Sequence, residues 1–305
     1  MGAGQRRFSP EFKHEAVRLE RYTTKPISTE IGRIPSLRGS ETQMSERGSL
    51  TVVGTGFRVS GQITHEAQSA IDGAEKLFHL VQDIVTHHWL EERNPTAESL
   101  YDSYAEGRPR RETYEEMVER MLAPVRAGRR VCAAFYGHPG VFVMPAHEAI
   151  RRARAEGFEA EMLPGISAED CLVAELGFDP GQGGCQSFEA TDFLIRHRRF
   201  DPTSHLILWQ IGSIGVSDFR EGDLWNPEGV AILARELGAT YGAAHEVEIY
   251  EAAPYPICPP KRHRCRLDEL SQAPVTLAST LYVPPLPNRP SDPALRAALG
   301  MGPAP

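Results

Sequence analysis

An arginine and a tyrosine four residues apart, Arg110 and Tyr114, are a pair that could do chemistry. At the start of a helix this spacing puts both side chains on one face, and the preceding loop can bring Tyr104 back to them. A guanidinium stays charged, so it can stabilise an oxygen that gains negative charge. It also favours a neighbouring phenolate, which could accept a proton. A solvated basic loop is the open alternative, and Arg108 and Arg111 fit it.

Two glycine turns mark a second candidate region. The apolar runs 131–135 and 158–163 predict strands, with a helix over 147–156 between them. The first strand ends in the turn 136–140 and the second in the turn 164–167. Ligands of open α/β sheets bind beyond the carboxyl ends of strands, so these turns predict a small-molecule site. Ordinary turn chemistry also explains such glycines, and spacing alone favours it.

The remaining elements are predicted from periodicity. Apolar residues recur at helical spacing after Arg110, Gly128 ends the run, and Thr113 with Glu116 predicts a capping box at its start. Further strands are predicted over 50–53, 76–80, 205–211, 246–251 and 280–283, and a further helix over 227–237. Alternating strands and helices predict an α/β protein.

Composition excludes several classes. The 305 residues are 41% hydrophobic and 24% charged, as in soluble globular proteins, with a formal net charge of -8. Residues 1–48 hold 9 Lys and Arg against 6 Asp and Glu, which leaves 24 against 35 in the rest. An acidic folded part argues against a nucleic-acid partner.

Cysteine and hydropathy patterns predict a cytoplasmic location. The five cysteines include no C-x-x-C pair, which indicates reduced thiols, and no histidine has a metal-ligand spacing, so no metal site is expected. No apolar run approaches the length of a membrane span, and the N-terminus lacks the apolar centre of a signal peptide. We therefore expect no membrane partner.

Residues 1–48 are polar without a sustained apolar period, so we expect a disordered extension. The stretch 6–19 resembles the opening of insertion-sequence transposases, but the second helix that would enter a DNA groove is missing. A fused gene fragment, or a start upstream of Met44, explains this stretch better than a nucleic-acid function.

Several motifs in order resemble one enzyme class. They are Phe135-Tyr-Gly-His-Pro-Gly-Val-Phe-Val143, Met162-Leu-Pro-Gly-Ile-Ser-Ala-Glu-Asp170, Gln186-Ser-Phe-Glu-Ala-Thr191, Leu208-Trp-Gln-Ile-Gly-Ser213 and Leu281-Tyr-Val-Pro-Pro285. Together they resemble the tetrapyrrole-methylase class (class III) of S-adenosylmethionine-dependent methyltransferases. More narrowly, they resemble the borosin peptide backbone α-N-methyltransferases.

The resemblance implies two αβα domains, over 49–166 and 167–285, with the cofactor cleft between them and a tail over 286–305. It implies that Arg110, Tyr114 and Tyr104 form the methyl-transfer site. Gly54 and Gly56 would shape the cleft floor. The implied contacts to S-adenosylmethionine are Tyr136, Gly137, His138, Pro139, Gly140, Val141, Phe142, Gly165, Ser167, Ala168, Gln210, Gly212 and Ser213.

The implied activity is methylation of backbone amides in a ribosomally made precursor. Many fungal relatives carry the substrate as a C-terminal extension, whereas residues 286–305 contain no apolar repeat. We therefore expect a split arrangement, with a separate precursor modified in trans by a homodimer or by a complex with the precursor. The alternatives are C- or O-methylation of a tetrapyrrole or another small molecule, and a methylase-like binding protein without catalysis.

Overall fold

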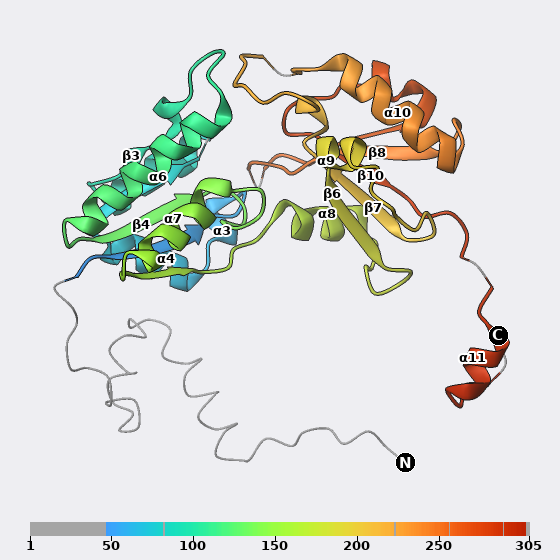
Figure 1. Cartoon of the computed structure of the whole chain (residues 1–305), viewed down its shortest axis with the longest axis horizontal. Coiled ribbons are helices and arrows are strands. Elements are labelled where there is room, and N and C mark those ends of the chain that lie inside the picture. The colour runs from blue at the N-terminus through green and yellow to red at the C-terminus, as the bar shows by residue number, and fades with distance from the viewer. Residues whose placement is uncertain (1–46, 82, 223, 256, 289, 303–305) are drawn as a thin grey trace. The chain divides into compact units, whose positions relative to one another are not determined.

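Two five-stranded sheets organise the part of the chain that the structure describes (Figure 1). In this computed structural model the described residues are 47–81, 83–222, 224–255, 257–288 and 290–302, so the extension expected over 1–48 lies almost wholly outside them. Residues 47–305 form one compact unit. No helix among the described residues combines the length and apolarity needed to cross a bilayer.

The first sheet is entirely parallel, in the order β3-β2-β4-β1-β5. Its strands are β1 (Ser49–Gly54), β2 (Lys76–Leu80), β3 (Glu98–Ser99), β4 (Arg130–Phe135) and β5 (Glu159–Met162). Parallel strands end at a common edge, so the loops after β1, β4 and β5 meet there. The predicted strands over 76–80 and 131–135 are confirmed.

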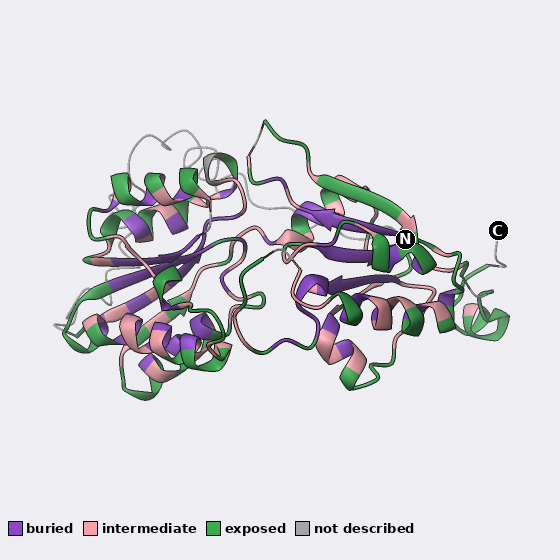
Figure 2. Ribbon diagram, turned by 90° about the horizontal axis from the view of Figure 1, so that it is seen from above, coloured by how far each residue is buried: buried purple, intermediate pink, exposed green. Residues whose placement is uncertain are grey.

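Helices cover both faces of this sheet. They are α3 (Val59–Gln62), α4 (His65–Gly73), α5 (Ile84–Arg93), α6 (Arg110–Arg126) and α7 (Met144–Ala155), with a short 3-10 turn η2 (Tyr101–Ser103). Leu50 and Val52 point into a core shared with α6 and α7, whereas Val53 packs with residues of α4 and α5. This alternation follows from the period of two along a strand. Figure 2 shows the strands buried between helices whose outer faces are exposed.

The second sheet is mixed, in the order β6-β7-β10-β8-β9. Its strands are β6 (Cys185–Glu189), β7 (His205–Trp209), β8 (Glu246–Glu251), β9 (Lys261–Arg266) and β10 (Thr280–Val283). β6 runs parallel to β7, and β10 runs antiparallel to both β7 and β8. The strands predicted over 246–251 and 280–283 are confirmed. β6 and β9 lacked an apolar pattern in the sequence, because β6 is mostly half-buried with mixed polar and apolar residues and β9 is mostly exposed and basic.

The second sheet is also packed on both faces. Its helices are α8 (Ala168–Leu176), α9 (Ala190–Ile195) and α10 (Pro227–Tyr241), its 3-10 turns are η3 (Ile211–Ser213) and η4 (Leu267–Gln272), and α11 (Pro293–Ala298) follows. Leu206 and Leu208 pack with α10, whereas Ile207 and Trp209 pack with α8. The predicted strand over 205–211 is two residues too long, because Gln210 adopts a left-handed conformation that ends it.

Candidate functional site

Helix α6 begins at Arg110, three residues before Thr113, the N-cap that the sequence predicted. Its N-cap is Pro109, whose φ of -57° suits a helix start, and no described side chain caps it. The predicted capping box is wrong: Thr113 is buried inside the helix, and Glu116 accepts hydrogen bonds from Ser103 Oγ (2.8 Å) and Arg108 Nη1 (2.7 Å). Arg108 is therefore bound to its neighbours, which corrects its interpretation as a solvated residue.

The structure brings together the three residues predicted for methyl transfer. The rings of Tyr104 and Tyr114 lie 6.5 Å apart and nearly perpendicular. The Arg110 charge acts on Tyr104, and the Arg110 guanidinium donates to the carbonyl of Val216. We call Arg110, Tyr104 and Tyr114 the reaction corner.

Electrostatics in the reaction corner keep Tyr104 protonated. Burial raises its pKa far above the ordinary value, and the neighbouring phenols of Tyr114 and Tyr136 raise it further. Arg110 lowers the pKa as predicted, but burial and the two phenols outweigh that effect. Crowding of protein atoms around its hydroxyl, followed by Tyr114, also raises the pKa of Tyr136, although the residue as a whole keeps 44% of its surface exposed. Of the two tyrosines that sequence analysis left open as the base, Tyr104 is therefore the one whose phenolate is disfavoured by burial.

The glycine loops of the first sheet meet through their backbones. A Cβ on Gly54 would lie 2.3 Å from the carbonyl oxygen of Gly137, and one on Gly165 would lie 3.0 Å from the Cα of Gly54. Gly56 and Gly137 form an isolated antiparallel bridge. Gly54 and Gly165 lack room for a larger side chain, whereas Gly137 has a φ of 67° that favours glycine, and we call these three residues the glycine junction. Their first requirement is close packing of three loops.

The loop after β4 presents aromatic and apolar side chains. Tyr136, Val141 and Phe142 remain 44%, 40% and 49% exposed. His138 Nδ1 accepts from the Gly140 amide (3.0 Å), and His147 Nε2 donates to the Gly140 carbonyl (2.7 Å), so this turn is fixed by its own side chains. Phe142, at a φ of 57°, places its ring 5.9 Å from that of Trp209, which ends β7.

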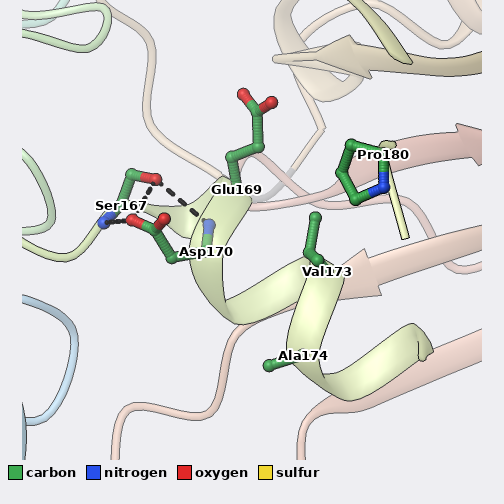
Figure 3. A pocket seen from close by; sticks show the side chains of 6 residues that line it. All are labelled: Ser167, Glu169, Asp170, Val173, Ala174 and Pro180. Atoms are coloured by element: carbon green, nitrogen blue, oxygen red, sulfur yellow. Dashed lines mark hydrogen bonds between the residues drawn. The ribbon is translucent and has the colours of Figure 1, made fainter. Parts of the chain in front are cut away.

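The loop after β5 leads into α8 through a capping box. Ser167 Oγ accepts from the Asp170 amide (3.1 Å), and Asp170 Oδ2 accepts from the Ser167 amide (2.6 Å). In Figure 3 the Asp170 carboxylate turns toward Ser167, while Glu169 points away from both. They line an open hollow of about 370 Å³ with Val173, Ala174 and Pro180. Of the predicted cofactor residues it touches Ser167, so it lies beside the predicted site and does not coincide with it.

The predicted loop over Gln210 to Ser213 packs against the backbone at Thr276. Gln210 has a φ of 60°, and a Cβ on Gly212 would lie 2.3 Å from the carbonyl oxygen of Thr276. Glu251 accepts hydrogen bonds from Thr276 Oγ1 (2.5 Å) and Ser279 Oγ (2.7 Å), which fixes the backbone that Gly212 packs against.

Two aromatic residues beside the reaction corner were missed by sequence analysis. The Phe219 ring lies 5.0 Å from that of Tyr104, and the Arg110 Cζ lies 5.8 Å from the centre of the Trp225 ring. Both residues belong to an irregular loop without apolar periodicity, so no pattern pointed to them.

The predicted residues fit S-adenosylmethionine chemically. The half-exposed rings of Tyr136 and Phe142 offer π faces to a sulfonium and to a flat adenine. Among the described residues, no group of three or more His, Cys, Asp or Glu side chains is arranged to hold a metal ion.

Comparison with known proteins places the chain in a family. Residues 49–217 match the family described as Tetrapyrrole (Corrin/Porphyrin) Methylases. The chain therefore belongs to the tetrapyrrole methylase family, whose methyltransferases depend in general on S-adenosylmethionine.

Relatives with 40–45% sequence identity are methyltransferases whose names include a peptide precursor. A methyltransferase and ribosomally synthesised gymnopeptide precursor from Gymnopus fusipes is 45% identical over 250 residues, which are 81% of this chain and 59% of that protein. The omphalotin A precursor methyltransferase of Omphalotus olearius is 41% identical over 252 residues, 81% of this chain and 60% of that protein. A type I borosin precursor methyltransferase of Mycena rosella is 40% identical over 263 residues, with coverages of 85% and 65%. The chain spans about three fifths of the length of these relatives.

Solved structures share the fold. The uroporphyrin-III C-methyltransferase of Thermus thermophilus superposes with a TM-score of 0.57 at 20% identity, covering 78% of this chain and 93% of that one. A cobalt-precorrin-4 methyltransferase gives a TM-score of 0.56 at 16% identity, covering 77% and 94%. The predicted α/β, tetrapyrrole-methylase-like fold is confirmed.

Proposed function

We propose that this protein uses S-adenosylmethionine to α-N-methylate backbone amides of a separate, ribosomally made precursor peptide. The observation that carries the proposal is the reaction corner, where the charge of Arg110 acts on Tyr104 and the Tyr104 ring lies against that of Tyr114. The relatives whose names combine a methyltransferase with a peptide precursor support a peptide as the acceptor.

The reaction corner suits an amide acceptor. An amide nitrogen is a poor nucleophile because its lone pair is delocalised into the carbonyl. When bound, the cofactor supplies an activated methyl group, so the protein must remove the N–H proton and stabilise charge on oxygen. In our proposal the Arg110 guanidinium binds that oxygen. Burial keeps the proton on Tyr104, so Tyr114 is the proposed base.

Residues 286–305, which follow the last strand, are poor acceptors for methylation of a backbone amide. Five of these twenty residues are proline, whose nitrogen carries no proton to lose. The amides of Arg296 and Leu299 are already bonded to the carbonyls of Asp292 and Leu295, at 3.0 Å each. Methylation there would first have to break this helix.

Calorimetry tests cofactor binding on the folded protein. We expect heat on addition of S-adenosylmethionine or its demethylated product, and a mass increase of one or more methyl groups on a co-expressed precursor from a neighbouring gene. Absence of binding would contradict the methyltransferase proposal. Methyl groups on residues 286–305 would contradict the separate precursor, and methylation of a small molecule alone would favour the tetrapyrrole-type alternative.

A further inference from the structure

A loop of the second sheet completes the reaction corner of the first. Residues 216–222, here called the strap, follow η3 and run antiparallel to the segment 107–110. The Gly107 amide donates to the Phe219 carbonyl (2.8 Å), and the Phe219 amide donates to the Arg108 carbonyl (2.9 Å). Two segments more than 100 residues apart in the sequence are therefore tied by reciprocal backbone bonds.

The strap also supplies the missing cap of α6. The Arg110 amide, which no side-chain cap serves, donates to the carbonyl of Ser217 (2.9 Å). The Arg110 guanidinium donates to the carbonyl of the preceding residue, Val216. Both ends of Arg110 are thus held by neighbouring carbonyls of the second sheet's loop, which fixes where the guanidinium points.

Two aromatic side chains, Phe219 and Trp225, also contact the residues proposed to react, Tyr104 and Arg110. The Phe219 ring lies 5.0 Å from the Tyr104 ring and 5.7 Å from the Trp225 ring. The Trp225 ring lies under the Arg110 guanidinium, and its backbone amide donates to the Gly212 carbonyl (2.9 Å) in the predicted cofactor loop. Trp225 therefore links the cofactor loop to the predicted cation.

We infer that Trp225 and Phe219 are positioning residues for methyl transfer, holding Arg110 and Tyr104 at a fixed place relative to the Gly212 loop. This inference rests on the proposed function. Aromatic faces attract a guanidinium, and a displacement of about 1 Å at a reacting group can cost about 100-fold in rate.

Matched substitutions separate positioning from packing. Trp225 Nε1 is buried without a hydrogen-bond partner among the described residues, so Trp225→Phe keeps the aromatic platform and breaks no bond. Trp225→Leu removes the platform. Arg220 lies in the strap but pairs with Asp218 at the surface, so Arg220→Ala is the control in the same segment.

The experiment measures kcat and KM on a precursor peptide, cofactor affinity and the melting temperature. We expect Trp225→Leu to lower kcat about 10- to 100-fold with cofactor affinity unchanged. Trp225→Phe and Arg220→Ala should stay near wild type, and Phe219→Leu should show a smaller loss of kcat. Wild-type turnover in Trp225→Leu, or equal losses in Trp225→Phe and Trp225→Leu, would overturn the inference.

A double-mutant cycle covers the case in which Trp225→Leu is simply less stable. If Trp225 acts through Arg110, adding Trp225→Leu to Arg110→Ala should cause no further loss of kcat. Independent, additive losses would show that Trp225 only packs the fold. Full turnover in Arg110→Ala itself would overturn the proposed function, and the inference with it.

Discussion

The glycine junction and the reaction corner both belong to the first sheet and its connections but are built in opposite ways. Gly54, Gly137 and Gly165 meet backbone to backbone at the carboxyl edge of one sheet. Arg110, Tyr104 and Tyr114 meet through side chains, and the strap from the second sheet holds them. The close approach of the loops requires these glycines, whereas the proposed chemistry belongs to the side chains of the reaction corner.

This contrast predicts two kinds of damage. Changes at the glycine junction should lower stability, and with it everything else. Changes in the reaction corner should lower turnover in a protein that stays folded and binds cofactor. The predictions below test that separation, beginning with the largest expected effect.

Arg110→Ala should lower kcat about 10²- to 10³-fold, or about 2.7–4 kcal/mol in activation free energy. The reason is that the guanidinium stabilises an oxygen charge that exists only as the amide proton leaves. Cofactor affinity should change little, because a sulfonium gains nothing from a nearby cation. Single-turnover kinetics on peptide and calorimetry with the cofactor measure the two effects separately, and Arg110→Lys should fall between. A matching loss of cofactor affinity would break the separation.

Gly54→Ala should destabilise the fold by about 1–3 kcal/mol or more, because its Cβ would collide with the Gly137 carbonyl. The matched control is Gly238→Ala within α10, where the nearest atom to an added Cβ is 3.9 Å away. Alanine there should be neutral or stabilising by about 0.5–1 kcal/mol. Denaturant unfolding decides, and a folded, stable Gly54→Ala that merely fails to bind cofactor would assign the glycine to the ligand instead.

The glycines of the junction are recognisable in the sequence as turn motifs, but their packing against one another is not. Glycine and proline after apolar runs identified the loop ends, but a contact between Gly54 and Gly165 depends on the register of parallel strands. Periodicity located β2, β4, β8 and β10 because most of their buried residues are apolar, although His79, Glu248 and Glu251 are buried as well. Periodicity missed β9. This strand pairs with β8 along its whole length, but its residues are mostly basic and exposed.

The reaction corner was found only in part for the same physical reason. Arg110 and Tyr114 share one helix, so their proximity follows from local geometry. Phe219 and Trp225 reach the corner through a loop more than 100 residues later, which no local pattern encodes. The pKa of Tyr104 depends mainly on its burial, which the sequence does not show. The direction of its pKa shift could therefore not be derived from Arg110 alone.

His79 offers a test of whether the interior of the first sheet can be perturbed apart from the reaction corner. Burial, followed by the nearby His87, lowers the pKa of His79 to about 4, while Glu91 opposes the change. As pH falls, the unfolded chain binds this proton first, so the stability due to neutral His79 is complete above about pH 6.5 and is lost toward pH 4. We expect a loss of about 1–2 kcal/mol between pH 6.5 and 5.

The measurement is the free energy of unfolding against pH, in wild type and in His79→Leu. The substitution should flatten the curve in this window whatever its effect at neutral pH. An unchanged slope would show that another group titrates there. Turnover at pH 8 should be close to wild type in any His79 variant that remains folded.

The smallest expected effects come from the two arginines that flank Arg110, and they locate the edge of the reaction corner. Arg108 donates to Glu116 (2.7 Å) and to the Ser103 carbonyl (2.9 Å), and so ties the 3-10 turn before Tyr104 to helix α6. Removing hydrogen bonds to a partly exposed charged group costs about 1 kcal/mol, so Arg108→Ala should lower the melting temperature and reduce kcat only a few-fold.

Arg111 is exposed on the next position of the helix, and Arg111→Ala should change stability by less than about 0.5 kcal/mol with turnover intact. Turnover of all three arginine variants on one peptide gives the ranking Arg110, then Arg108, then Arg111. Should Arg111→Ala abolish turnover while Arg110→Ala does not, the assignment of the cation is displaced by one residue. The strap would then bind an arginine with a structural role only, and Arg111 would replace Arg110 as the residue proposed to stabilise charge on the amide oxygen.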